Sequence, residues 1–170
     1  MKIVLGIFKQ INDAKSAVSK LLDNGFKEEQ MNVIVQENTA KQYLDVNRQE
    51  VKVEKTDSLG KKHLKGLDSL LGGVRAIVTP DAGRVFAAGA VASTLAKTAA
   101  SMNDGGLKGA LSDFNVPNET AKDYRDSIAN GGLLFWIRTD ESQTGDAIII
   151  IENCKAEDVI SISQSFPPLR

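Results

Sequence analysis

Apolar positions at the start of the chain follow first a strand pattern and then a helix pattern. Residues 2–8 form a short apolar run rich in β-branched side chains, which is typical of a buried strand. From Ile11 to Leu22, apolar residues recur at three- and four-residue steps on one helical face. Gly25 follows, where a left-handed residue can close the helix, and residues 31–35 give a second strand. The pattern predicts a β-α-β unit.

The end of the chain repeats this order of elements. The pattern there is strand, helix and strand at residues 133–138, 142–153 and 159–162. Four consecutive isoleucines inside the expected helix are β-branched, and propensity alone would favour a strand. Ala147, Ile151 and Cys154 nevertheless keep a helical stripe, so we predict a helix there.

Two β-α-β units predict an α+β fold of the ferredoxin-like type. This split β-α-β plait has a four-stranded antiparallel sheet with two helices on one face. We expect a single domain over residues 1–170, with its core in residues 1–38 and 118–166. Residues 39–117 form a large insertion between the halves, which is too long for a structureless loop and is expected to be mostly helical.

Local patterns predict several elements between the two halves. Expected are a helix at 39–44, an edge strand at 49–54, a helix at 59–71, an extended segment or hairpin at 76–87, a small-residue helix at 90–101 and helices at 107–113 and 118–130. The expected hairpin turns at Pro80 and Asp81, and the last helix begins after Pro117 and stops at Gly131.

Composition and charge exclude several classes of function. The 170 residues are 42% hydrophobic and 25% charged, as in ordinary globular domains. One cysteine, Cys154, forbids an intrachain disulfide, and with no signal peptide we expect a cytoplasmic protein. One histidine, His63, and one cysteine cannot form a zinc site, and a net charge of −1 does not favour nucleic acid. No catalytic motif is present, so we expect no enzyme, no metal and no cofactor.

The small-residue segment contains an alanine ladder. Its members repeat every fourth residue: Ala88, Ala92, Ala96 and Ala100. Small side chains at this spacing let two helix backbones approach closely, so we predict a helix-packing surface. The apolar run at 85–96 is shorter than the roughly 20 residues that cross a bilayer, so we expect no transmembrane segment.

A basic stretch lies on the predicted helix at 61–71. Lys61, Lys62 and Lys65 lie on its polar side, opposite leucines that include Leu71. Such a helix can contact an anionic membrane surface or an acidic partner. The alternative is an ordinary solvated face.

A glycine pair precedes the predicted helix at 107–113. Gly105, Gly106 and Lys108 could place backbone amides and a positive charge around an anion at the helix N-terminus. The segment does not match a phosphate-loop motif, and the alternative is a simple turn.

Several segments resemble a known bacterial family in the same order along the chain. They are residues 2–8, 21–26, 32–35, 83–90, 116–124 and 130–134. This order of strand, helix, Gly-Phe, strand, Gly/Ala-rich segment, Pro-initiated helix and Gly-Gly turn is similar to the heat-induced or general stress proteins of the YflT type. Where that family often has a long glycine-zipper run, this chain has residues 58–67. The resemblance implies stress-linked bacterial expression and no established enzymatic activity.

Together these patterns favour a protein that binds or assembles. The first hypothesis is a non-enzymatic stress-response protein acting through self-association or a protein partner. Open sheet edges invite pairing with a second copy, so we expect a homodimer. The alternatives are a small-molecule or anion-binding regulatory domain, or a peripheral membrane module acting through the helix that begins at Lys61.

Overall fold

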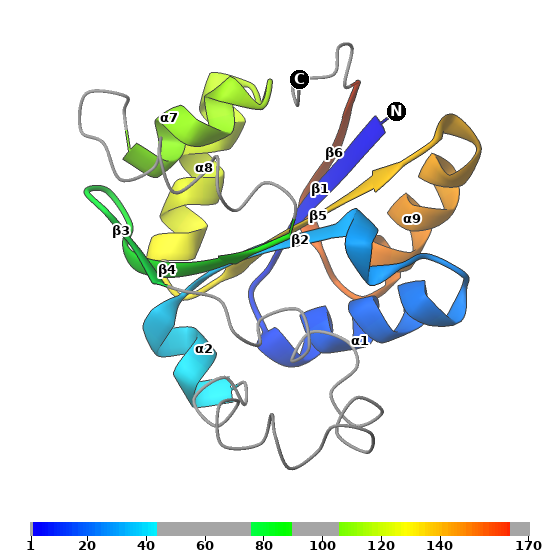
Figure 1. The fold of residues 1–170 in the computed structure, drawn as a ribbon, viewed down its shortest axis with the longest axis horizontal. Helices are drawn as coiled ribbons and strands as arrows, with labels where there is room; N and C mark the ends of the chain where they lie inside the picture. The colour runs from blue at the N-terminus through cyan, green and yellow to red at the C-terminus, as the bar shows by residue number, and fades with distance from the viewer. Residues whose placement is uncertain (1, 44–75, 90–105, 164–170) are drawn as a thin grey trace.

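A six-stranded antiparallel sheet forms the centre of an α+β fold in the computed structural model, which describes residues 2–43, 76–89 and 106–163 (Figure 1). Its strands lie in the order β3-β4-β2-β5-β1-β6. They are β1 (Lys2–Phe8), β2 (Met31–Gln36), β3 (Ala76–Thr79), β4 (Gly83–Ala88), β5 (Leu133–Thr139) and β6 (Glu157–Ser163). The helices are α1 (Ile11–Asp23), the short 3-10 helix η1 (Glu28–Gln30), α2 (Glu37–Tyr43), α7 (Gly106–Asp113), α8 (Asn118–Ala129) and α9 (Glu141–Asn153).

The predicted β-α-β unit at the start of the chain is confirmed. Helix α1 buries the apolar stripe that includes Ile11, Val18 and Leu21. Gly25 then adopts φ +95°, and the amide of Phe26 donates to the carbonyl of Leu21 at 3.0 Å. This left-handed closure, which favours glycine, ends the helix where the sequence predicts.

The isoleucine-rich segment is a helix, as predicted. The carboxylate of Asp140 accepts a hydrogen bond from the amide of Gln143 at 3.1 Å and caps the start of α9. Ala147 and Ile151 are fully buried and Cys154 is nearly so, which places the predicted stripe on the sheet. Packing and capping therefore outweigh the strand propensity of the isoleucines.

The expected four-stranded sheet is wrong in its strand count. Residues 76–87 form a hairpin, as predicted, but its strands β3 and β4 extend the central sheet. Strand β4 pairs with β2, with Ala88 opposite Val33 and Phe86 opposite Val35. The pairing satisfies the outer backbone groups of β2, which a four-stranded sheet would leave at an edge. The described part of the insertion therefore supplies two of the six strands of the sheet.

Helices cover both faces of the sheet, and not one face alone. Figure 1 shows α1 and α9 on one side of the sheet and α7 and α8 on the other. The first side buries Phe8 and Phe135, whose rings meet edge to face at 6.3 Å. The second side buries Trp136 with Tyr124 of α8. This explains why the first five residues of β5, an apolar run without alternation, are all buried.

An ion pair holds helix α2 to the start of β4. The guanidinium of Arg84 donates two hydrogen bonds to the carboxylate of Glu37, at 2.7 and 3.1 Å. The ammonium of Lys41 lies 3.5 Å from the same carboxylate. The Arg84 hydrogen bonds hold the pKa of Glu37 below its usual value.

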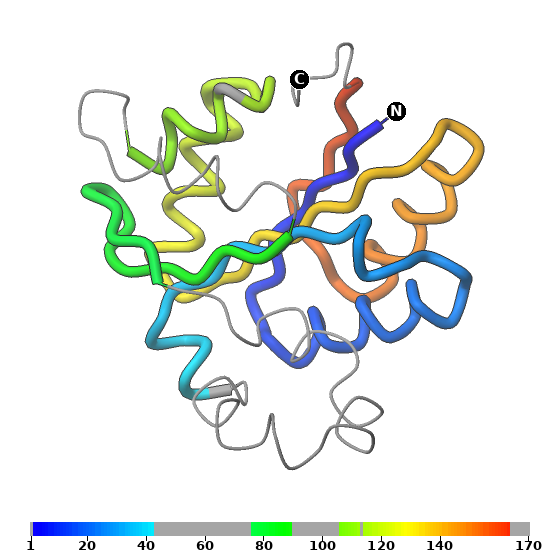
Figure 2. Tube along the Cα trace, in the orientation of Figure 1, coloured from blue at the N-terminus to red at the C-terminus, as the bar shows by residue number. Residues whose placement is uncertain are grey.

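Three predicted elements lie outside the described residues: the strand at 49–54, the helix at 59–71 and the helix at 90–101. The helices predicted at 39–44, 107–113 and 118–130 correspond to α2, α7 and α8. Figure 2 follows the chain from β1 to β6. The start of β1 lies beside the end of β6, with Lys2 opposite Ser163.

Candidate functional site

The N-terminus of α7 is the part of the predicted anion site that the structure describes. The backbone amides of Leu107 and Lys108 donate to the two carboxylate oxygens of Asp81, at 2.7 and 3.1 Å. Gly106 has φ +66°, and a Cβ at this position would meet the same carboxylate. An external anion would have to displace Asp81, and Gly105 lies outside the described residues.

A tight turn between β3 and β4 positions Asp81. The amide of Ala82 donates to the Thr79 hydroxyl at 2.9 Å, and that hydroxyl donates to the carbonyl of Gly83 at 2.8 Å. A guanidinium nitrogen of Arg125, on α8, lies 3.9 Å from Asp81. The carboxylate therefore connects the hairpin to α7 and α8.

Of the other predicted site residues, the structure describes Ala88 and leaves the rest outside the described ranges. Ala88 is the last residue of strand β4, where it is buried and pairs with Val33, so the first alanine of the ladder belongs to the sheet and not to a helix. The physical reason is that the antiparallel pairing of β4 with β2 extends as far as Ala88. The remaining members lie outside the described residues, namely Ala92, Ala96, Ala100, Lys61, Lys62 and Lys65.

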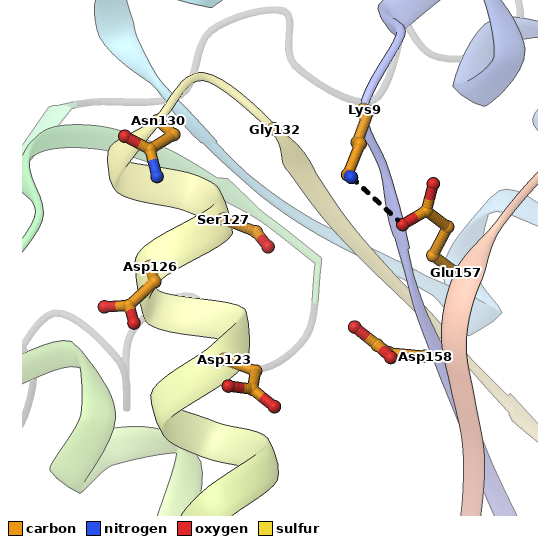
Figure 3. Close-up of a pocket in the computed structure, with 8 residues that line it drawn as sticks. All are labelled: Lys9, Asp123, Asp126, Ser127, Asn130, Gly132, Glu157 and Asp158. Carbon is orange, nitrogen blue, oxygen red and sulfur yellow. Dashed lines mark ion pairs between the residues drawn. The ribbon is translucent and has the colours of Figure 1, made fainter.

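A cleft of about 520 Å³ opens between α8 and the start of β6. Figure 3 shows its walls, with Asp123 and Ser127 of α8 pointing towards Asp158 of β6. The lining residues are Lys9, Asp123, Asp126, Ser127, Asn130, Gly132, Glu157 and Asp158. Four carboxylates and one lysine make this lining acidic.

The two walls of the cleft are joined beneath it by Tyr124. Its side chain is fully buried, and its hydroxyl donates to the backbone carbonyl of Asp158 at 2.6 Å. Burial raises the pKa of Tyr124 above its usual value, and the negative charge of Asp158 raises it further. Asp158 itself has φ +51°, and the pairing of β6 with β1 shifts register beside it, between Leu5 and Ile7. The register shift therefore lies at the same place as the contact between β6 and α8.

Two of the four carboxylates have cationic partners. The ammonium of Lys9 lies 3.3 Å from Glu157, with both side chains at least half exposed, so the pair contributes only about 0–1 kcal/mol. Asp126 accepts from the guanidinium of Arg125 at 2.7 Å and points away from Asp158 in Figure 3. The carboxylates that face each other across the cleft are therefore those of Asp123 and Asp158.

A second hollow of about 430 Å³ adjoins the cleft. It shares Lys9 and Asn130 with the cleft, and its other polar lining is uncharged, including Gln36 and Thr39. Both hollows lie at the end of the sheet where β1 and β2 finish and β5 begins.

Carboxylates are the most numerous charged groups of the cleft, and they accept hydrogen bonds. Within the described ranges, no group of three or more His, Cys, Asp or Glu side chains is placed to hold a metal ion. Cys154 is buried at the C-terminal end of α9, and His63 lies outside the described residues. The facing carboxylates favour a positively charged or hydrogen-donating group over an anion.

Sequence reasoning missed the cleft residues. Asp123 and Asp126 lie one helical turn apart, and the pair of acids at 157–158 precedes an apolar run, so each wall leaves a weak local trace. The two walls are more than thirty residues apart along the chain, and no sequence motif connects them. Their approach depends on which face of the sheet α8 covers.

The described elements define an α+β protein with a central antiparallel sheet. Comparison of the chain with protein-family models, curated proteins and solved structures found no match. Across the described ranges, no helix combines the length and the apolar character needed to cross a bilayer.

Proposed function

We propose that this chain is a non-enzymatic assembly module that works through self-association or through binding a protein partner. One observation carries the proposal: helices cover both faces of the sheet, while β3 and β6 each pair on one side only among the described residues. The outer backbone N–H and C=O groups of an edge strand are a template for another strand. The edges are therefore the part of this sheet best suited to recognise another chain.

We also propose that the core has a ferredoxin-like architecture. The order β2-β5-β1-β6, fully antiparallel, with α1 and α9 on one face, supports this architecture. Strands β4 and β3 then extend the plait beyond β2, and α7 and α8 cover its second face. A plait of this kind hosts many unrelated activities, so it supports no particular chemistry.

The biological setting proposed here is a bacterial, cytoplasmic stress response. Its support is the sequence resemblance to the YflT-type proteins. The alternatives, an anion-binding regulatory domain and a membrane-surface module, stay predictions, because their basic helix and Gly105 lie outside the described residues.

Sedimentation velocity over a concentration series of the full chain tests the proposal. We expect a concentration-dependent rise in sedimentation coefficient towards that of a homodimer. A monomer at every concentration, together with no protein captured from a cell lysate of the source organism, contradicts it.

A further inference from the structure

Within the ranges that the structure describes, most of the outer edge of β6 lacks the features that usually protect an edge strand. Proteins block such edges with charged side chains, prolines, bulges or very short strands. In β6 the charges and the bulge lie at the start, at Glu157 and Asp158, while the stretch from Val159 to Ser163 has no charge and no proline. The opposite edge strand, β3, is only four residues long and is followed at once by Pro80.

We propose that a second copy of this chain pairs its β6 with β6, antiparallel, across a two-fold axis at Ser161. The pairing joins two six-stranded sheets into one continuous sheet. This inference rests on the self-association proposed above and names its surface and its partner.

Geometry restricts where the axis can lie. Antiparallel strands of one continuous sheet are related by an axis normal to the sheet, so each face continues across the interface. Residues directly opposite each other then share a face, which requires the axis to pass at a residue and not between two residues. Within β6 this leaves a small set of registers.

The register centred on Ser161 matches side chains of the same kind at its three central positions, with serine opposite serine and isoleucine opposite isoleucine. It places Ile160 opposite the partner copy's Ile162, and Val159 opposite the second copy's Ser163. Ile160 and Ile162 are half-buried and already pack against the core beneath α7 and α8. Ile162 also lies opposite Ile3 of β1, and Ile160 opposite Leu5. An apolar row would therefore run from β1 of one copy through both β6 strands to β1 of the other.

Charge and backbone shape disfavour the neighbouring register. An axis at Ile160 places the carboxylate of Asp158 opposite an isoleucine, and the φ of +51° at Asp158 interrupts the extended strand there. With the axis at Ser161, Glu157 and Asp158 of each copy lie beyond the paired stretch and away from each other. The acidic start of β6 then sets one limit of the interface.

Cysteine cross-linking tests the axis directly. In the predicted pair, position 161 faces itself, at a Cα separation of about 4.5–5.5 Å, within the range that a disulfide spans. We expect Ser161→Cys to give a disulfide-linked dimer rapidly under mild oxidation. Ser19→Cys, on the exposed surface of α1, is the matched control, and the unchanged chain with its buried Cys154 is the second control. Neither control should cross-link at the same rate.

The outcomes separate this inference from the function on which it rests. A dimer by sedimentation whose Ser161→Cys variant cross-links no faster than Ser19→Cys overturns the β6 interface and leaves self-association standing. A monomer by sedimentation with no cross-linking overturns the β6 pairing and removes self-association from the proposed function. Circular dichroism of both cysteine variants shows that each is folded before the rates are compared.

Discussion

Residues in the left-handed conformation follow four of the described helices, α1, α7, α8 and α9, and one of the four is a lysine. Gly25 and Gly131 close α1 and α8 with φ of +95° and +100°, and Asn115 closes α7 with φ +73°. Lys155 closes α9 with φ +76°. A lysine in this conformation places its Cβ close to the neighbouring carbonyl oxygen, which glycine avoids.

Lys155→Gly should therefore stabilise the protein. Relief of the left-handed conformation gains about 1–2 kcal/mol, and the greater freedom of glycine in the unfolded chain offsets about 0.5–1 kcal/mol of this. We expect a net rise of about 0.5–1 kcal/mol in the free energy of unfolding by urea. Lys20→Gly, at an exposed helical position of α1, is the matched control and should lower it by about 1 kcal/mol. Equal losses in both variants contradict the interpretation.

The buried hydroxyl of Tyr124 should make stability depend on alkaline pH. Its pKa is raised in the folded protein, so the folded state keeps the phenol protonated where the unfolded state loses the proton, above the ordinary value of 10.0. The free energy of unfolding is therefore unaffected by this group below pH 10.0 and falls as the pH rises from there towards the raised pKa of the folded state. Tyr124→Phe loses one hydrogen bond, so near neutral pH it should be less stable by about 1 kcal/mol.

Urea titrations of wild type and Tyr124→Phe at neutral and alkaline pH check this expectation. Above the ordinary tyrosine pKa, the stability difference between the two proteins should shrink, because only the wild type loses the ionisation-linked term. A difference that stays constant with pH contradicts a raised pKa at Tyr124.

At the scale of elements, capping and packing decide several structures that local propensity leaves open. Helix α9 contains four β-branched isoleucines, yet its Asp140 cap and buried Ala147 hold it as a helix. The stripe in the sequence was sufficient to predict this. The cap of α7 could not be predicted in the same way, because Asp81 lies twenty-six residues away along the chain.

Removal of the Asp81 carboxylate should loosen α7. Asp81→Ala leaves the amides of Leu107 and Lys108 without their acceptor, and the loss of a helix cap costs about 0.5–2 kcal/mol of unfolding free energy. Asp81→Asn keeps one acceptor oxygen and should lose less. Asp146→Ala, an exposed position within α9, is the control and should be neutral or slightly stabilising. Urea denaturation that places Asp81→Ala level with the control refutes the cap.

At the scale of the whole molecule, the sequence patterns predicted individual helices and strands better than they predicted how these elements pair and pack. The hairpin at 76–87 was expected, but nothing local indicates that Ala88 should pair with Val33. The helix at 118–130 was expected too, yet its side of the sheet depends on Tyr124 meeting Asp158. Strand β6 begins at Glu157, two residues before the predicted start. The prediction started later because Asp and Glu have low strand propensity. The cleft was missed for a different reason, because its walls come together only through long-range packing of α8 against the start of β6.

The whole-molecule claim is that two copies join through β6, and the mass in solution tests it most directly. Light scattering coupled to size-exclusion chromatography should give the wild type and Ser19→Lys twice the mass of one chain. Ser161→Lys places two ammonium groups opposite each other at the axis, where like charges are destabilising, and should give the mass of a single chain. A wild-type protein at the mass of one chain, or a Ser161→Lys variant that stays dimeric beside Ser19→Lys, would contradict the account.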